Sequence, residues 1–318
     1  MAQQEIWTIK RVLDWTCGYL ERKGDEHPRL SAEWLLANVT GMSRVELYVN
    51  FDKPLEEGEL SAMHAAIKRR ATGEPLQYVT GEMPFRHIVL RCERGVLIPR
   101  PETEILVDAA LEGVDEALAC AAEKSAEAEK GADAEKDDEL APPLARVLEV
   151  GTGTGCIALS IASERPGVHV TATDLSPRAI GLATRNREAL GLEEAVDIVE
   201  CDLASGVDPE LMGSFAVLVS NPPYIPTRVL SEEVPAEVAD FEPALALDGG
   251  PDGLDVFRRL LELAPVALVP GGMLAVELFE GSLEDAAALV REREGWASVE
   301  VREDLTRRPR VLVAKREA

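Results

Sequence analysis

Two short motifs contain the residues with the clearest chemical potential. The first is Asn221-Pro222-Pro223-Tyr224, which directly follows the apolar run FAVLVS. Its two prolines fix successive φ angles and remove two backbone N–H donors. The asparagine side chain and the neighbouring carbonyls are therefore expected to face outward as hydrogen-bond acceptors, while the tyrosine ring offers a flat face to a planar group. We take all four as candidate catalytic and substrate-binding residues.

The second motif is a glycine-rich turn, Gly151-Thr152-Gly153-Thr154-Gly155, between a predicted strand and a predicted helix. Glycines permit a sharp turn and the close approach of a ligand. A dinucleotide fingerprint would place a glycine at position 156, which is a cysteine, and the Gly-Lys-Ser/Thr of a triphosphate cradle is absent. The remaining option is a nucleoside ligand without pyrophosphate, and S-adenosylmethionine is the common one.

Two acidic residues lie at or near the ends of the predicted strands beside this turn. Asp174 ends the next strand, nineteen residues after Gly155, where a carboxylate can accept both ribose hydroxyls of an adenosyl ligand. Glu149 could face the cationic methionine end, directly or through an ordered water. The alternative is a tight strand-to-helix turn in which Asp174 only caps the next helix. Glycines and acid in register favour ligand binding.

Acceptors beside a sulfonium donor suit the methylation of a planar amide or amino nitrogen. The lone pair of such a nitrogen is delocalised, which makes it a poor nucleophile. Acceptors aimed at its N–H bonds favour the pyramidal geometry and stabilise the developing positive charge. Alignment of nitrogen, methyl and sulfonium at ~3–3.5 Å supplies the rest, and the alkylated nitrogen can lose its proton to solvent without a strong general base.

The elements that must position these motifs alternate between strand and helix after Pro143. This alternation predicts an α/β fold with an open, mostly parallel sheet and helices on both faces. Two final segments, WASVEVRED and RVLVAKRE, could form a closing pair. The expected strands are residues 146–150, 168–174, 195–202, 215–220 and 272–279, and the expected helices are residues 156–164, 176–191, 255–268 and 282–294.

The rest of the chain divides into three further parts. Residues 1–72 read as a small helical bundle, with Ser31 and Ser43 as expected helix caps and Gly24, Gly41 and Gly73 as expected stops. Residues 73–100 read as a connecting β-hairpin. Residues 112–143 form an acidic insertion; eleven acids and three lysines between 112 and 140 give it a local charge of −8. Such a segment is expected to be a solvated helix or a mobile insertion within the domain at 101–318.

Composition excludes several classes of protein. The 58 acidic against 33 basic residues give a net charge of −25, which disfavours a general nucleic-acid binder, because phosphate affinity comes from many lysines and arginines. No apolar run approaches the ~20 residues of a membrane span. The five cysteines lie far apart and none has zinc-ligand spacing. We expect a cytoplasmic monomer with reduced thiols, without a metal and without direct contact with nucleic acid or membrane.

Blocks spread over most of the chain resemble the PrmC/HemK-like family, the glutamine-N5 methyltransferases that modify class I peptide chain release factors. The similar segments are RRATGEPLQYVTGE (69–82), Phe85, VLIPRPETEILV (96–107), EVGTGTGCIALSIA (149–162), Asp174, NPPYIP (221–226) and EPALALDGGPDGL (242–254). The resemblance implies a Rossmann-like class I methyltransferase domain, S-adenosyl-L-methionine as cofactor, and a helical N-terminal domain that recognises the release factor. The substrate would be the glutamine of its Gly-Gly-Gln motif.

The resemblance also implies roles by position. Gly151, Gly153 and Gly155 would line the methionine end, Asp174 would hold the ribose, and Asn221 would contact the substrate amide. Phe85 and the loop from Arg100 to Glu102 would help to close the pocket, although Arg100 equally suits a surface or inter-domain ion pair. Asp202 would contact adenine or be a simple loop acid. The sequence departs from the family pattern outside the cofactor and acceptor motifs: Phe279 and Arg307 stand where a glycine is usual, and Ser282 stands where a glutamine is usual.

Three other functions remain open from the residues. A glutamine methyltransferase acting on a ribosomal protein would use the same chemistry with a different partner. A DNA or RNA amino-methyltransferase would also suit Asn-Pro-Pro-Tyr, but the charge of −25 disfavours it. A non-catalytic adaptor with the same fold is disfavoured by the intact Asn221–Tyr224 turn.

Overall fold

The computed structural model describes residues 6–129, 145–233 and 235–318 of the chain. Its contacts divide the chain into two compact units. The first comprises residues 1–82, 92–94 and 235–241, and the second comprises residues 83–91, 95–234 and 242–318. The first unit therefore extends ten residues beyond the boundary expected at residue 72 and includes a short segment from late in the chain. Among the described residues, none of the helices is both long and apolar enough to cross a membrane.

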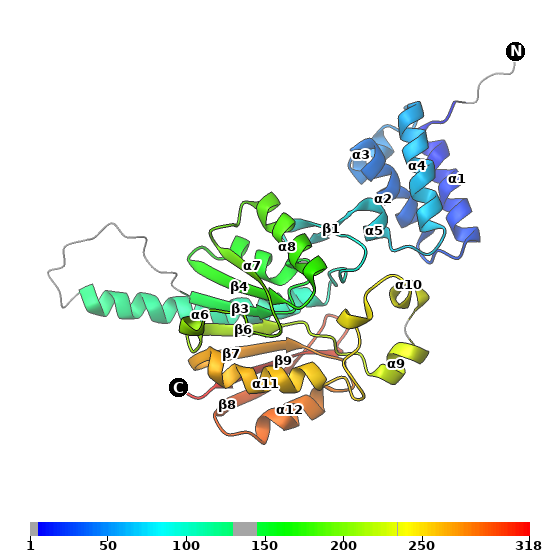
Figure 1. The fold of residues 1–318 in the computed structure, drawn as a ribbon. Coiled ribbons are helices and arrows are strands. Elements are labelled where there is room, and N and C mark those ends of the chain that lie inside the picture. The colour runs from blue at the N-terminus through cyan, green and yellow to red at the C-terminus, as the bar shows by residue number, and fades with distance from the viewer. Residues whose placement is uncertain (1–5, 130–144, 234) are drawn as a thin grey trace, which may run out of the picture. The chain divides into compact units, whose positions relative to one another are not determined.

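The first unit is a bundle of short helices with its own apolar core (Figure 1). Ser43 caps its helix as expected, because its hydroxyl accepts from the Glu46 N–H while the Glu46 carboxylate accepts from the Ser43 N–H. A left-handed glycine, Gly41, ends another helix. The helices are α1 (Ile9–Arg22), α2 (Pro28–Thr40), α3 (Arg44–Val49), α4 (Glu57–Arg70) and α5 (Leu76–Thr80).

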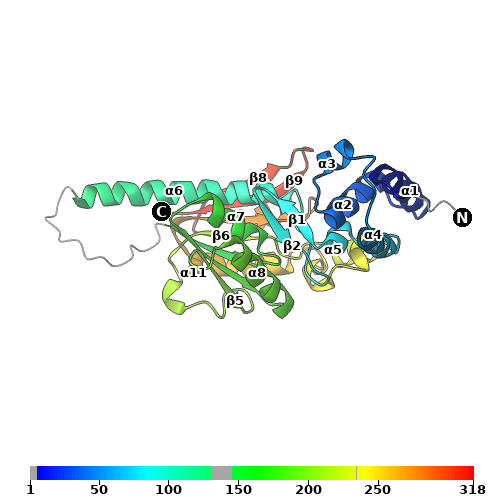
Figure 2. The same ribbon diagram turned by 90° about the horizontal axis from the view of Figure 1, so that it is seen from above.

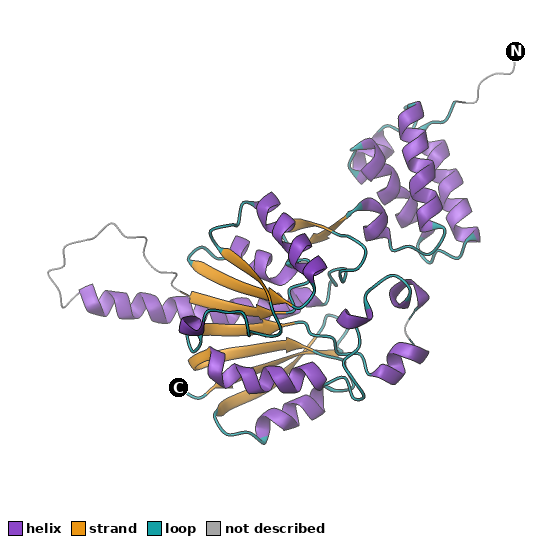
Figure 3. Ribbon diagram, in the orientation of Figure 1, coloured by secondary structure: helices purple, strands orange, loops and turns teal. Residues whose placement is uncertain are grey.

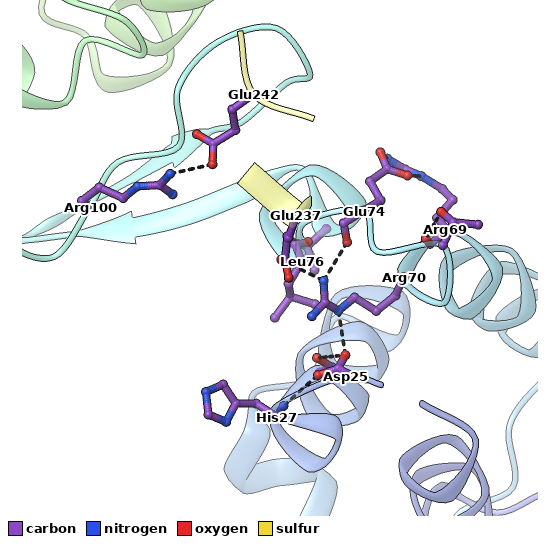
Figure 4. A network of polar contacts seen from close by, with 12 residues as sticks. Asp25, His27, Arg69, Arg70, Glu74, Leu76, Arg100, Glu237 and Glu242 are labelled. Atoms are coloured by element: carbon purple, nitrogen blue, oxygen red, sulfur yellow. Dashed lines mark hydrogen bonds and ion pairs between the residues drawn. The ribbon is translucent and has the colours of Figure 1, made fainter. Parts of the chain in front are cut away.

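Two details of this bundle differ from the sequence expectations. α2 begins at Pro28, so Ser31 lies inside the helix and does not cap it; its buried hydroxyl donates to Asp25 (2.8 Å). α5 occupies part of the segment expected to be only a hairpin. Arg70 at the end of α4 also binds Asp25 (2.7 Å) and Glu237 (2.9 Å), which ties segment 235–241 to the bundle (Figure 4).

The second unit contains a seven-stranded sheet in the order β5-β4-β3-β6-β7-β9-β8. Its first five strands in this order are parallel, and β9 pairs antiparallel with both β7 and β8. The predicted fold class, including the closing antiparallel pair, is confirmed. The strands are β3 (Ala145–Val150), β4 (Val168–Asp174), β5 (Val196–Glu200), β6 (Phe215–Ser220), β7 (Leu268–Glu277), β8 (Trp296–Glu303) and β9 (Pro309–Arg316).

Helices cover both faces of this sheet, as Figures 1 and 3 show. One apolar cluster joins α6 (Thr103–Glu129) and α7 (Cys156–Glu164) to one face, and α8 (Pro177–Leu190) packs beside them through Leu190. A second cluster joins α11 (Asp255–Ala267) and α12 (Leu283–Arg291) to the other face. The long loop after β6 contains the short helices α9 (Thr227–Glu232) and α10 (Ala236–Ala239) and a 3₁₀ turn at Ala244–Ala246. Another 3₁₀ turn, at Pro209–Leu211, precedes β6.

The acidic insertion begins inside a helix. α6 runs unbroken from Thr103 to Glu129 (Figure 2), so residues 112–129 are helical, and residues 130–144 lie outside the described part of the chain. The expected hairpin is a two-stranded sheet of β1 (Glu82–Phe85) and β2 (Ile88–Arg91). Near the C-terminus, Arg307 has a φ of +64°. This left-handed conformation explains why glycine suits that position.

Candidate active site

Three neighbouring strands end at the site and bring the two motifs together. In the parallel register Val150 of β3 pairs with Thr173 of β4 on one side and with Ser220 of β6 on the other. The next residues along these strands are the first glycine of the turn, Asp174 and Asn221. The strand order reverses between β3 and β6, which is the point where open α/β sheets bind ligands. The Ser220 hydroxyl donates to the Val150 carbonyl (2.7 Å) and locks the two strand ends together.

The glycine turn requires its glycines. The N–H groups of Gly151 and Thr152 both donate to the carbonyl of Thr173 (2.8 and 2.9 Å), which bends the chain back at the end of β3. Gly155 has a φ of +86°, and a Cβ there would lie 2.8 Å from Cδ1 of the fully buried Leu159. An L-residue at this position would be strained and would also displace the first turn of α7.

A cavity of about 250 Å³ opens beside this turn, slightly smaller than the ~300–1,000 Å³ of typical ligand clefts. Eight of the candidate site residues from the sequence line this cavity. They are Gly151, Thr152, Gly153, Thr154, Asp174, Asp202, Asn221 and Pro223. Apolar side chains complete its walls, among them Val96, Ile98, Leu175, Leu203 and Leu245. Glycine backbone, the carboxylates of Asp174 and Asp202 and apolar walls fit an adenosyl group.

Asp174 is held at the cavity by backbone donors. Its carboxylate accepts from the Gly153 N–H (2.9 Å) and from the Ser176 N–H (2.8 Å). Burial raises the pKa of this carboxyl, against the lowering effect of the same backbone hydrogen bonds. Asp174 thus connects the glycine turn to the start of α8, and its carboxylate faces the space where the ribose is expected.

Asp202 lines the cavity, but its carboxylate is already paired. It accepts from the Arg259 guanidinium (2.6 Å), and both side chains are about half exposed. Asp202 and Arg259 therefore line the cavity as an ion pair, and a contact of Asp202 with adenine stays a prediction.

Glu149 does not line the cavity, which corrects its expected position. Its side chain is fully buried, and one carboxylate oxygen accepts from the Thr152 hydroxyl (2.7 Å) and the Ala158 N–H (3.1 Å). The other oxygen is buried without a partner among the described residues. Burial raises the pKa of Glu149 to about 7. Its carboxylate thus supports the glycine turn and the start of α7 from inside the protein.

The acceptor turn is fixed by side chains from two distant elements. Asn221 Nδ2 donates to Thr103 Oγ1 (3.1 Å), and the Thr103 hydroxyl donates to Glu277 Oε2 (2.7 Å). The Tyr224 hydroxyl donates to the other oxygen of Glu277 (3.0 Å). Thr103 begins α6 and Glu277 ends β7. Burial raises the pKa values of Glu277 and Tyr224, so the phenol stays protonated at neutral pH and can donate.

A glycine-rich block holds the backbone of the same turn. The Ile225 N–H donates to the Leu247 carbonyl and the Gly249 N–H donates back to the Ile225 carbonyl, each at 2.9 Å. At Gly253, whose φ is +79°, a Cβ would lie 2.3 Å from the Tyr224 carbonyl oxygen. The segment at 242–254 therefore packs against the acceptor turn so closely that only glycine fits there.

Several predicted site residues lie outside the cavity lining. Phe85 is 1% exposed, packs in the apolar core with Leu90 and Leu106, and does not line the cavity. Pro222 is buried. The ring of Tyr224 packs partly against the second apolar cluster. Gly155 shapes the turn without lining the cavity.

An ion pair that the sequence left undecided closes one wall of the cavity. Arg100 binds the buried Glu242 (2.6 Å), whose other oxygen accepts from the Ile98 N–H (3.2 Å) (Figure 4). The ion pair of Arg100 with Glu242, here called the clasp, joins the loop at 95–100 to the loop at 243–246, and both loops line the cavity. Sequence reasoning missed Glu242, Thr103 and Glu277 as site residues. The first two lie in the resembling blocks at 242–254 and 96–107, which was the available signal.

Two family models and many sequence relatives match this chain. The model of the PrmC N-terminal domain matches residues 11–81, and the model of the methyltransferase small domain matches residues 138–240. The release factor glutamine methyltransferase of Geobacter sulfurreducens is 44% identical over 88% of this chain and 87% of that protein. The release factor glutamine methyltransferase of Rhodopirellula baltica is 37% identical over 96% of this chain and 95% of that protein.

A solved structure supports the fold. The hMettl16 catalytic domain, in complex with MAT2A 3′UTR hairpin 6, has a TM-score of 0.52 and 14% identity and matches 83% of each chain. At this identity the likeness concerns the fold alone.

The cavity and the Asp174 carboxylate suit S-adenosylmethionine, whose sulfonium supplies an electrophilic methyl group. From its sequence relatives and its domain matches, the chain belongs to the release factor glutamine methyltransferase family.

Proposed function

We propose that this protein transfers a methyl group from S-adenosylmethionine to the side-chain amide nitrogen of the glutamine in the Gly-Gly-Gln motif of class I peptide chain release factors. The observation that carries the proposal is the position of Asn221, which lines the adenosyl-type cavity directly beside the glycine turn. Relatives that are 34–44% identical over most of this chain are named release factor glutamine methyltransferases.

The residues of this chain would divide the work between the two substrates. Gly151 and Gly153 line the cavity with backbone, and Asp174 presents a carboxylate to the ribose. Asn221 presents an acceptor to an N–H of the substrate amide, which raises the nucleophilicity of the nitrogen and stabilises its developing charge. Pro222 and Pro223 lack N–H donors, so the turn offers the amide acceptors alone. Orientation and electrostatics thus supply the catalysis.

The partner and setting follow from the same proposal. The helical residues 1–72 would recognise the release factor, residues 73–100 would connect, and residues 101–318 would perform the transfer. Since the cavity is lined by one unit of one chain, a monomer would suffice. The net charge of −25 disfavours direct binding of nucleic acid. All five cysteines are free thiols, which supports a reducing cytoplasm.

Mass spectrometry of the protein substrate tests the proposal. The purified protein is incubated with S-adenosylmethionine and a class I release factor, and the peptides are searched for a single added methyl. We expect it on the glutamine of Gly-Gly-Gln and not on a release factor in which that glutamine is replaced by glutamate. Ribosomal proteins and duplex DNA serve as competing substrates. Methylation of either one in place of the release factor would overturn the assignment.

A further inference from the structure

The Asn221 side chain is the end of a hydrogen-bonded chain that begins at a buried carboxylate. Glu277 is 1% exposed and Thr103 is 1% exposed, while Asn221 reaches the cavity. Strands β6 and β7 are parallel neighbours with Ser220 opposite Val276. Asn221 and Glu277 therefore follow two paired positions, and Thr103 lies between their side chains.

The hydrogen bonds from Thr103 and Tyr224 favour the ionised form of Glu277. With Glu277 ionised, a count of the protons along this chain gives the direction of every hydrogen bond. The Thr103 hydroxyl has one proton, which it donates to Glu277 Oε2 at 2.7 Å. Its oxygen can then only accept, and it accepts from Asn221 Nδ2 at 3.1 Å. A carboxylate is an acceptor without a proton of its own. The amide group of Asn221 is thus oriented with its nitrogen toward Thr103, and its Oδ1 has no hydrogen-bond partner among the described residues.

From this arrangement we infer that Thr103 and Glu277 are positioning residues that select the acceptor orientation of Asn221. In the flipped orientation the Asn221 NH₂ group would meet the NH₂ group of the substrate amide, so two donors would face each other. We call the hydrogen-bonded chain from Glu277 through Thr103 to Asn221 the relay. The relay disfavours the flipped rotamer, because Asn221 Oδ1 would then face the Thr103 hydroxyl oxygen, whose only proton is already donated to Glu277. This inference rests on the proposed function, since it gives the acceptor a carboxamide as its target.

Thr103→Val tests the relay, because valine has nearly the same shape and neither donates nor accepts. We expect kcat to fall about 10²-fold, as when one preorganised polar contact is lost, while KM for the release factor and the Kd for S-adenosylmethionine stay within about threefold. Thr103→Ser restores the hydroxyl and is expected to restore kcat to within about threefold. Thr16→Val is the matched control, because Thr16 is buried and its hydroxyl has no partner in the part of the chain that the structure describes.

Glu277→Gln tests the far end of the relay. A glutamine NH₂ can donate to Thr103, which frees the Thr103 proton to bind Asn221 Oδ1 and reverses the orientation. We expect a comparable loss of kcat. The double variant Thr103→Val/Glu277→Gln is expected to lose no more than either single variant, because both act through one relay.

A readout on the protein without cofactor or substrate separates the relay from the reaction. Nuclear magnetic resonance follows the side-chain NH₂ of Asn221, assigned by its disappearance in Asn221→Ala. We expect faster hydrogen exchange of this group in Thr103→Val and an unchanged signal in Thr16→Val. The inference is overturned if Thr103→Val keeps both its NH₂ signal and its kcat, or if Thr103→Ser is as impaired as Thr103→Val. If wild-type protein methylates no release factor, the proposed function fails, and the NH₂ signal still decides the relay.

Discussion

Replacing the buried Glu149 by glutamine is expected to change how the stability of the protein depends on pH. Burial raises the pKa of this carboxyl from 4.5 to about 7. The folded state therefore holds a proton that the unfolded chain releases between those two values. In that window the unfolded state binds fewer protons, so the free energy of unfolding falls as pH rises. Below about pH 4.5 the contribution is fully present, and above about pH 7 it is lost.

The size of this effect follows from the shift in pKa. Each pKa unit corresponds to 1.36 kcal/mol, so a shift from 4.5 to about 7 amounts to about 3 kcal/mol. Glu149→Gln has no titrating group at this position. Its free energy of unfolding relative to the wild-type protein is therefore expected to rise by about 3 kcal/mol as the pH increases from 4.5 to 7. Comparing the two proteins cancels the titration of other carboxyls.

Urea denaturation at several pH values between 4.5 and 8 measures this difference. Glu123→Gln, at an exposed position on α6, is the control, and its difference from the wild-type protein is expected to stay constant. A difference between Glu149→Gln and the wild-type protein that does not change with pH would contradict the raised pKa of Glu149. It would mean that Glu149 is already charged in the folded protein at low pH.

Three further predictions concern the walls of the site. Arg100→Met leaves the carboxylate of Glu242 buried without its cation, and isothermal titration calorimetry is expected to show about tenfold weaker binding of S-adenosylmethionine; unchanged affinity would contradict a role for the clasp. Gly253→Ala would displace the Tyr224 backbone. We expect its free energy of unfolding in urea to fall by about 1–3 kcal/mol and its turnover to be lower. Gly191→Ala, whose Cβ would meet open space, is the control and should keep its turnover. Arg307→Gly relieves a left-handed φ, so stability should rise by about 0.5–1 kcal/mol; lower stability would argue against strain there.

The regular part of the fold could be predicted because its signals are local. The helix at 156–164 and the strands at 168–174 and 215–220 have the predicted bounds, since apolar runs and glycines mark both of their ends. Ser31 shows where local signals fail. Its sequence suits a helix cap, but Pro28 starts the helix earlier and Asp25 takes the hydroxyl.

The site could be predicted as far as topology determines it. Parallel strand ends lie at one edge of a sheet, so the meeting of Asp174, the glycine turn and Asn221 followed from the strand order. Which way a neighbouring side chain points depends on packing, so the sequence alone does not reveal that Glu149 and Phe85 are buried in the protein interior. The relay joins residues that are 118 and 174 positions apart, a separation that no local pattern spans.

We propose that the cofactor and the substrate amide are held by different residues at adjoining strand ends. Measurements of kcat and of the Kd for S-adenosylmethionine in Asn221→Ala and Asp174→Ala distinguish the two roles. Asn221→Ala is expected to lower kcat by about 10²–10³-fold with the Kd within about threefold. Asp174→Ala is expected to raise the Kd by about 10- to 100-fold with little change in kcat at saturating cofactor. Near-normal turnover in Asn221→Ala, or a loss of the same quantity in both variants, would contradict the account.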